Sequence, residues 1–199
     1  MSHLIAPMFP LPSYFLFPGA ASPLRVFEPR YRQMVEDLLD GPGRLVMACV
    51  DPEHVHEMAG DPPVLETGGL GEIARHRRLP NGEYLIWVVG LGRVRIEEIE
   101  SDRLYRRARG HLLETPDLDQ EAEIADLGLS LQLRDAIAEH SEEELELPDE
   151  ASIGFLADVL AQCLPLPVPR LRQCFEELDP RRRADLVLGE HRLRGTSSE

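Results

Sequence analysis

The sequence predicts an α+β protein in which a β-rich barrel or sandwich is followed by a bundle of helices. Near residue 115 the hydrophobic pattern changes from short strand-like runs to the longer period of helices. The charge changes at the same place. Residues 1–115 hold 13 Arg and 16 Asp or Glu, whereas residues 116–199 hold 8 Arg and 20 Asp or Glu. We therefore expect a β-rich domain over 1–115 and an acidic helical bundle over 116–199.

Strand-like runs and turns dominate the first half. Pro80-Asn81-Gly82 joins two apolar runs, which is a strong hairpin signal. The prolines of the first run favour an edge or barrel-rim strand. The expected strands cover 8–17, 24–27, 44–50, 71–79, 84–89, 94–99 and 104–113. We read the glycine-rich stretch 68–71 as a bend into the hairpin, and Trp87 as a core residue.

One helix is expected in this half, over residues 29–39. Tyr31, Met34, Val35, Leu38 and Leu39 recur at helical spacing and form one apolar face. Proline is well tolerated at the first helical position, and the glycines and proline of residues 40–43 end the helix. The helix begins at a corner formed by Glu28-Pro29-Arg30.

One hypothesis for the charged pair at that corner, Glu28 and Arg30, is a catalytic role. Arg30 would lower the pKa of the Glu28 carboxyl, which makes a poor general acid. Glu28 instead lies at the positive end of the helix, and Arg30 can fold back onto carbonyl groups or an acid. We expect both residues to fix the corner rather than to react.

The second half reads as helices. They are expected over 119–140, 153–164, 171–178 and 184–193, with an acidic loop over 142–150. Asp179 is an expected N-cap, with Pro180 in the first turn. Arg181, Arg182 and Arg183 would pair with nearby acids at the surface.

Composition excludes several kinds of chemistry. The net charge of −15 argues against nucleic-acid binding, which requires a basic face. All 21 cationic residues are arginine. The absence of lysine excludes a Walker A loop, a Schiff-base lysine and a Ser-Lys pair. We expect no enzyme activity and no cofactor.

The expected location is the bacterial cytoplasm, in a protein that does not enter a membrane. Cys49, Cys163 and Cys174 are distant in sequence, and we expect them to be reduced and buried. No run reaches the roughly 18 apolar residues of a membrane span. The N-terminal apolar run is interrupted by prolines and has no cation before Arg25, unlike a secretory signal.

One cluster has the composition of a metal site. His54-x-His56 on an extended segment would point both rings to one side, and Glu57 could add a carboxylate. The cluster comprises Cys49, Asp51, Glu53, His54, His56 and Glu57. The other interpretation, which we favour, is a polar surface loop without metal. The basic run 75–78 also has two interpretations, an anion-binding site and a solvated hairpin tip, and we favour the solvated tip.

Four blocks in order resemble a known family. The stretch from Phe17-Pro18-Gly19 to Phe27-Glu28-Pro29-Arg30-Tyr31 resembles the opening signature of the Lon protease N-terminal (substrate-binding) domain. Residues 71–74 and 89–96 resemble two later blocks, and 171–193 is similar to the closing region. The signature residues expected to have structural roles are Phe17, Pro18, Gly19, Phe27, Glu28, Pro29, Arg30, Tyr31, Gly90 and Arg93.

The resemblance implies a PUA-like pseudo-barrel before the helical bundle. It also implies a non-catalytic module that recognises unfolded or exposed apolar polypeptide, in a stand-alone protein related to proteolysis, with a protease or chaperone as a further partner. Two alternatives remain: a metal-dependent enzyme around His54 and His56, and an assembly module that docks a partner through its acidic helical half. The position of a peptide-binding site is not predicted.

Overall fold

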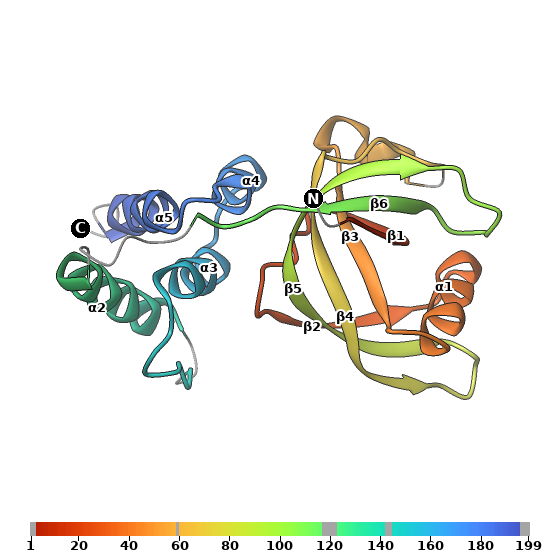
Figure 1. Cartoon of the computed structure of the whole chain (residues 1–199), viewed down its shortest axis with the longest axis horizontal. Coiled ribbons are helices and arrows are strands. Elements are labelled where there is room, and N and C mark those ends of the chain that lie inside the picture. The colour runs from red at the N-terminus through yellow and green to blue at the C-terminus, as the bar shows by residue number, and fades with distance from the viewer. Residues whose placement is uncertain (1–2, 59, 117–122, 142–144, 196–199) are drawn as a thin grey trace. The chain divides into compact units, whose positions relative to one another are not determined.

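The computed structural model describes residues 3–58, 60–116, 123–141 and 145–195. The chain divides into two compact units, Met1–Leu113 and Glu114–Glu199. Strands make up most of the first unit and helices the second, as Figure 1 shows. The predicted α+β class, with strands first and helices second, is confirmed.

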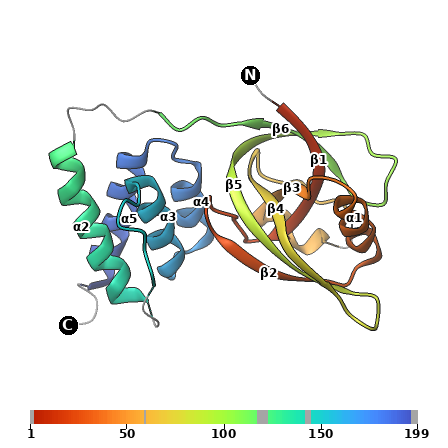
Figure 2. The ribbon, with the colours of Figure 1, turned by 60° about the horizontal axis from the view of Figure 1, so that its bottom comes forward.

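The first unit is a small barrel. Its strands lie in the order β2-β5-β4-β3-β1-β6, and an additional pairing of β5 with β6 closes the ring (Figure 2). This closure decides for a barrel over a sandwich. The elements are β1 (His3–Pro12), β2 (Ala21–Val26), α1 (Pro29–Leu39), β3 (Arg44–Val50), the 3-10 helix η1 (Pro52–Glu57), β4 (Thr67–Arg78), β5 (Tyr84–Ile99) and β6 (Arg107–Leu112).

The first strand has partners on both sides, so of the two positions that its prolines favour, an edge and a barrel rim, the edge does not apply. β6 pairs with the first five residues of β1, and β3 pairs with the last five. The Met8 amide donates to the Arg106 carbonyl, so even-numbered amides of a regular strand face β6. The backbone nitrogens of Pro10 and Pro12 therefore face the β6 side of β1, beyond the residues that β6 pairs with. The nitrogen of Pro7 faces the β3 side, before the first residue that β3 pairs with. Each proline lies where no ladder hydrogen bond is required.

The helix α1 has the predicted bounds and lies against one side of the barrel (Figures 1 and 2). Tyr31, Met34, Val35 and Leu38 are buried as expected, whereas Leu39, the last residue of the helix, is 37% exposed and does not join the predicted face. They join the main core with apolar residues of the strands, which are Phe9, Leu16, Val26, Leu45, Met47, Tyr84, Ile86, Val88 and Tyr105. The amphipathic face of α1 thus covers the barrel interior.

The glycine-rich stretch 68–71 lies inside β4 and is not a bend before it. The reason is close packing with the segment that follows β1. An added Cβ at Gly69 would lie 2.4 Å from the Leu16 carbonyl oxygen, and one at Gly90 would lie 2.0 Å from that of Phe17. Only glycine allows the backbones to approach this closely.

The second unit contains four helices in its described part. They are α2 (Glu123–His140), α3 (Ile153–Cys163), α4 (Val168–Glu176) and α5 (Pro180–Gly195). The expected start of the first helix at residue 119 lies outside the described residues. The predicted cap of the last helix is confirmed, because the Asp179 carboxylate accepts hydrogen bonds from the amides of Arg181 and Arg182 at 2.9 and 3.1 Å.

One arginine of the 181–183 run is buried, contrary to the expectation of surface pairing. The Arg183 Nε lies 2.8 Å from an Asp158 carboxylate oxygen, and these side chains are only 2% and 3% exposed. Arg183 also donates to the Glu177 carbonyl oxygen. Arg181 forms the expected outer pair, with Asp126 at 2.8 Å. A charged pair therefore lies within the packed helices.

The cysteines are free thiols. Cys49 and Cys174 are buried, whereas Cys163 is partly exposed, so the expectation of three buried cysteines holds for two. Burial raises the pKa of the Cys174 thiol to about 11. Across the described residues, the helices are too short or too polar to cross a bilayer.

Candidate functional site

The outer face of the sheet formed by β2, β5 and β4 carries the barrel's only tryptophan. Ile86 and Val88 are fully buried in the core. Trp87 lies between them, and alternation along a strand turns its side chain to the opposite face. Trp87 is partly exposed. The buried clusters formed by the described residues do not include it, so the core assignment from sequence was wrong.

The strand register surrounds this tryptophan with a mixed apolar and basic surface. Pro23 of β2 and Arg75 of β4 are the direct cross-strand neighbours of Trp87. The Arg75 guanidinium lies 5.3 Å from the indole ring centre, which is a cation–π contact. The next outward-facing row is Arg25, Leu85 and Arg77. We call this face the Trp87 platform: Pro23, Arg25, Leu85, Trp87, Val89, Arg75 and Arg77.

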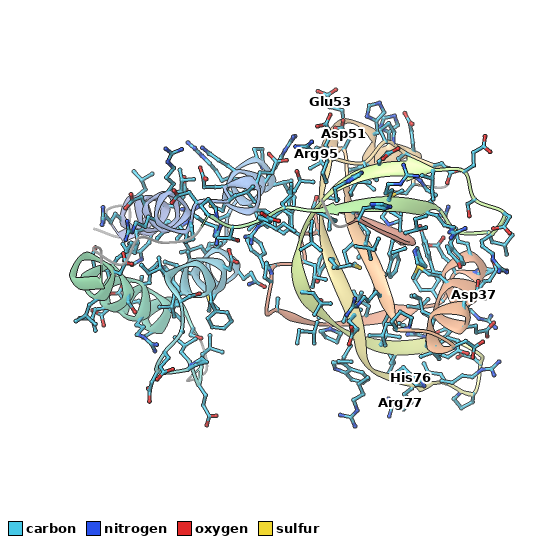
Figure 3. The ribbon with its side chains drawn as sticks, viewed as in Figure 1. Asp37, Asp51, Glu53, His76, Arg77 and Arg95 are labelled. Atoms are coloured by element: carbon cyan, nitrogen blue, oxygen red, sulfur yellow. The ribbon has the colours of Figure 1, made fainter. Side chains whose placement is uncertain are left out.

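Its charges are only partly paired. The Arg25 Nε lies 2.6 Å from a Glu83 carboxylate oxygen, and this hydrogen bond lowers the pKa of the Glu83 carboxyl. Figure 3 places His76 and Arg77 at the outer end of the β4–β5 hairpin. Arg78 lies over the Tyr84 ring at 5.8 Å. All four residues of the basic run are exposed, as expected of a solvated segment, and two of its arginines also lie over aromatic rings.

The Glu28–Tyr31 corner has the arrangement of a structural clamp. The Arg30 Nε donates to Glu28 at 2.9 Å, and its terminal nitrogens donate to the Met58 and Gly60 carbonyls, both at 3.2 Å. Its guanidinium lies 4.8 Å from the Tyr31 ring centre. Burial raises the pKa of Tyr31. These contacts tie the start of α1 to the segment after η1.

A shallow groove of about 620 Å³ lies beside this corner, which we call the corner groove. Leu104 is 66% exposed at its edge, and Phe27, the residue before the corner, is 61% exposed. The lining residues are Glu28, Pro29, Arg30, Met58 and Leu104. The groove is a second exposed apolar surface of the barrel.

The other signature residues meet at a different place. The Gly19 amide donates to the Gly90 carbonyl at 2.8 Å. The Arg93 guanidinium lies 5.6 Å from the ring centre of the buried Phe17. Pro18 lies between Phe17 and Gly19 in the same connection. Blocks far apart in the sequence are thus packed together where the β1–β2 connection crosses β5.

The histidine cluster has no ligand geometry. His54 and His56 lie on the 3-10 helix η1, not on an extended segment, so residues two apart do not point the same way. His54 lies 3.8 Å from Asp51, and His56 lies 3.4 Å from Glu57. No group of three or more potential ligands occurs among the residues that the structure describes. Nothing in this arrangement supports the metal-enzyme alternative.

The fold and these surfaces define a class of α+β protein in which a closed barrel, with apolar residues on its outside, precedes a helical unit. The family is shown by a direct match. Residues 5–190 match the model of the ATP-dependent protease La (LON) substrate-binding domain, and the chain belongs to this family. The resemblance inferred from the sequence blocks is confirmed.

Individual relatives agree with this assignment. Lon protease 2 of Sorangium cellulosum is 32% identical over 196 residues, which cover 92% of this chain and 24% of the relative. Lon protease 2 of Myxococcus xanthus is 24% identical over 192 residues, covering 92% and 23%. The chain therefore spans about a quarter of the length of the curated relatives that it matches.

Solved structures share the fold. A Lon N-terminal domain protein from Xanthomonas campestris has a TM-score of 0.66 at 22% identity, covering 94% of this chain and 98% of that one. The N-terminal domain of a Mycobacterium avium complex Lon protease has a TM-score of 0.65 at 17% identity, with the same coverage.

Proposed function

We propose that the chain is a polypeptide-recognition module that binds unfolded or exposed apolar segments on the Trp87 platform. The outward orientation of Trp87 is the observation that carries this proposal. Tryptophan and arginine are the residues most enriched at the energetic centres of protein interfaces, and here Trp87 and Arg75 are in contact. A large aromatic ring on a solvent-facing sheet surface is suited to an apolar side chain of a partner.

The flanking arginines define the second feature of the partner. Because Arg75 and Arg77 border the indole ring, a segment with carboxylates next to apolar residues would match the platform in charge. Family membership supports a polypeptide as the ligand, and we propose that bound segments are delivered to a protease. No catalytic step by this chain is required.

The test is binding of a permanently unfolded, carboxymethylated protein, compared with the same protein in its native fold. We expect saturable binding of the unfolded form alone. Trp87→Ser should weaken it at least tenfold, since loss of an interface centre typically costs about 2 kcal/mol or more. Circular dichroism should show an unchanged fold, because Trp87 lies outside the core clusters.

Leu104→Ser is the matched control. Leu104 is an exposed apolar residue of the corner groove and is not one of the platform residues. Full binding by this variant, together with weak binding by Trp87→Ser, supports the platform. The reverse pattern would move the site to the corner groove, and no binding by the unmodified chain would refute polypeptide recognition.

A further inference from the structure

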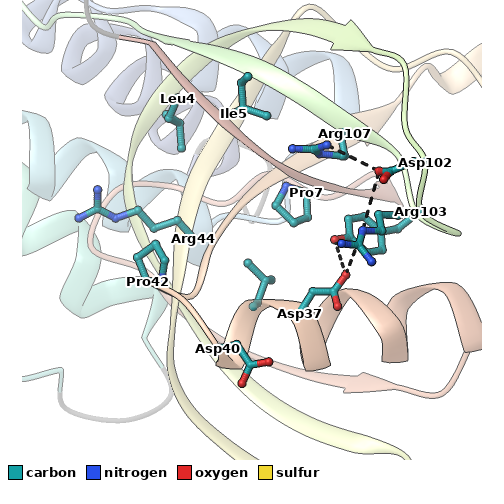
Figure 4. Close-up of a pocket in the computed structure, with 12 residues that line it drawn as sticks. Leu4, Ile5, Pro7, Asp37, Asp40, Pro42, Arg44, Asp102, Arg103 and Arg107 are labelled. Atoms are coloured by element: carbon teal, nitrogen blue, oxygen red, sulfur yellow. Dashed lines mark hydrogen bonds and ion pairs between the residues drawn. The ribbon is translucent and has the colours of Figure 1, made fainter.

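A second groove of about 600 Å³ lies between α1, the start of β1 and the segment before β6 (Figure 4). Its volume falls within the range of roughly 300–1,000 Å³ that is typical of ligand pockets. It is mixed in character, with an apolar base and charged borders. The lining residues are Leu4, Ile5, Pro7, Asp37, Leu38, Asp40, Pro42, Arg44, Asp102, Arg103, Tyr105 and Arg107. We call it the β1 groove.

One side of the β1 groove is an open strand edge. The first five residues of β1 pair with β6, whereas β3 pairs only with the last five. The Met8 amide faces β6, so the peptide groups of Ile5 face the other side by regular alternation. No strand pairs with this part of β1 on that side within the described residues. The N–H and C=O groups of Ile5 are therefore directed toward the groove.

The side chains of this edge are suited to an extended ligand. Ile5 is 51% exposed and lines the groove beside Leu4. Pro7 has no amide, which ends the open edge at the point where β3 begins. An exposed strand edge is a template for pairing with another segment.

The ion pairs recorded for the β1 groove include all of its arginines but not all of its carboxylates. Arg103 lies 3.7 Å from Asp37 and 3.8 Å from Asp102, as Figure 4 shows. Arg107 lies 3.9 Å from Asp102. The Arg44 Nε lies 3.1 Å from Glu72, which is outside the groove. The three arginines therefore already have carboxylate partners.

Asp40 is the carboxylate without an ion pair among those recorded for the described residues. It is the C-cap of α1 and lines the β1 groove. The carbonyl end of a helix carries partial negative charge and favours cations. The α1 side of the groove is thus suited to a cationic group.

We propose that the β1 groove binds an extended polypeptide segment that adds to the barrel as a β-strand along the first residues of β1. Main-chain hydrogen bonds to Ile5 supply the affinity, as in other cases of strand addition. Alternate apolar side chains of the segment lie beside the exposed Ile5, and a lysine or arginine lies beside Asp40. This site differs from the Trp87 platform in place, in ligand charge and in recognising the backbone.

The test uses a capped eight-residue peptide with alternating valine and lysine, a glutamate counterpart, and a version N-methylated at alternate amides. We expect the lysine peptide to bind saturably in fluorescence anisotropy and to slow hydrogen exchange of the Ile5 amide. N-methylation should weaken binding more than tenfold, because it removes the donors of the added strand. The glutamate peptide should bind more weakly than the lysine peptide.

Variants locate the site. Asp40→Asn should weaken lysine-peptide binding about two- to fivefold, the range of a single exposed ion pair. Glu53→Gln is the matched control, because Glu53 is an exposed acid at another end of the barrel (Figure 3) and should leave binding unchanged. Trp87→Ser should also leave it unchanged, which separates this site from the proposed platform.

Several results would overturn the proposal. No saturable binding of the lysine peptide would do so, as would binding without slowed exchange at Ile5. Equal affinity for the N-methylated peptide would exclude strand addition. Equal affinity for the glutamate peptide would exclude the role of Asp40. Loss of binding in Trp87→Ser would assign the peptide to the Trp87 platform.

Discussion

Arg30 illustrates how a single side chain can fix a corner. It contacts Glu28, Tyr31 and two carbonyl groups after η1 at once. We expect Arg30→Ala to lower the unfolding free energy by about 1–3 kcal/mol, because hydrogen bonds of a charged group lose a partner. Thermal unfolding measures this, and Arg95→Ala, at an exposed arginine of β5, should have little effect.

Glu28→Ala and Arg30→Ala together test the structural role of the corner. Glu28→Ala should act in the same direction as Arg30→Ala, because it removes the carboxylate that Arg30 contacts at 2.9 Å. An unchanged melting temperature combined with weaker binding of unfolded protein would instead assign the corner to ligand recognition. The structural role of these two residues thus stays a prediction.

Tyr105 makes the free energy of unfolding depend on pH in the alkaline range. Its hydroxyl donates to Asp37 at 2.8 Å, and burial together with this acid raises its pKa to about 12. The folded protein therefore holds the phenolic proton more tightly than the unfolded chain. The resulting stability is complete below about pH 10 and is lost as pH rises toward 12.

We expect Tyr105→Phe to flatten this part of the pH profile. Denaturant unfolding at pH 8 to 12 should show a smaller fall in unfolding free energy for the variant than for the unmodified chain. Tyr14, Tyr31 and Tyr84 also have raised pKa values, so part of the fall will remain. An identical slope in both proteins would contradict the role of Tyr105.

At the scale of elements, local signals located helices better than strands. The proline at the start of α1 and the turn after it fix both ends, and the predicted bounds match. The first strand is predicted over 8–17 but covers 3–12, and its prolines are accommodated by the staggered ends of β3 and β6. β5 was expected as two strands because Gly90 and Gly92 resemble turn residues, whereas they serve close packing and an irregular register.

The candidate site could not be located from the sequence for a related reason. The run around Trp87 is apolar on both sides of the strand, so alternation gave no indication of which face was buried. The long β5 reaches beyond the closed part of the barrel to pair with β2, and this pairing creates the outer face of the platform. Such a face depends on which strands become neighbours, and single-sequence patterns do not carry that information.

The cap of α5 gives a test at the same scale. Asp179 accepts hydrogen bonds from two amides of the first turn, and these bonds lower its pKa. We expect Asp179→Ala to cost about 1 kcal/mol of stability, whereas Asp179→Asn should retain most of it, since asparagine also caps well. Chemical denaturation of the three proteins measures the difference. Equal losses in both variants would show that the charge matters more than the cap.

At the scale of the whole molecule, the two units carry separate spectroscopic reporters. The only tryptophan of the chain is Trp87, in the barrel, so its fluorescence follows that unit. Most of the helical residues belong to α2–α5, so far-ultraviolet circular dichroism mainly follows the second unit. Unfolding of each unit can therefore be followed in the intact chain.

The buried pair of Asp158 and Arg183 allows one unit to be destabilised selectively. Asp158→Ala leaves a buried guanidinium without its carboxylate, which typically costs about 3–5 kcal/mol. Asp126→Ala, which removes only the more exposed pair with Arg181, should cost about 1 kcal/mol or less. If each unit is stabilised by its own core, Asp158→Ala will lower the circular dichroism midpoint and leave the Trp87 midpoint in place. A joint shift of both midpoints would show that the chain unfolds as one cooperative body, in which case binding at the barrel would depend on the integrity of the helices.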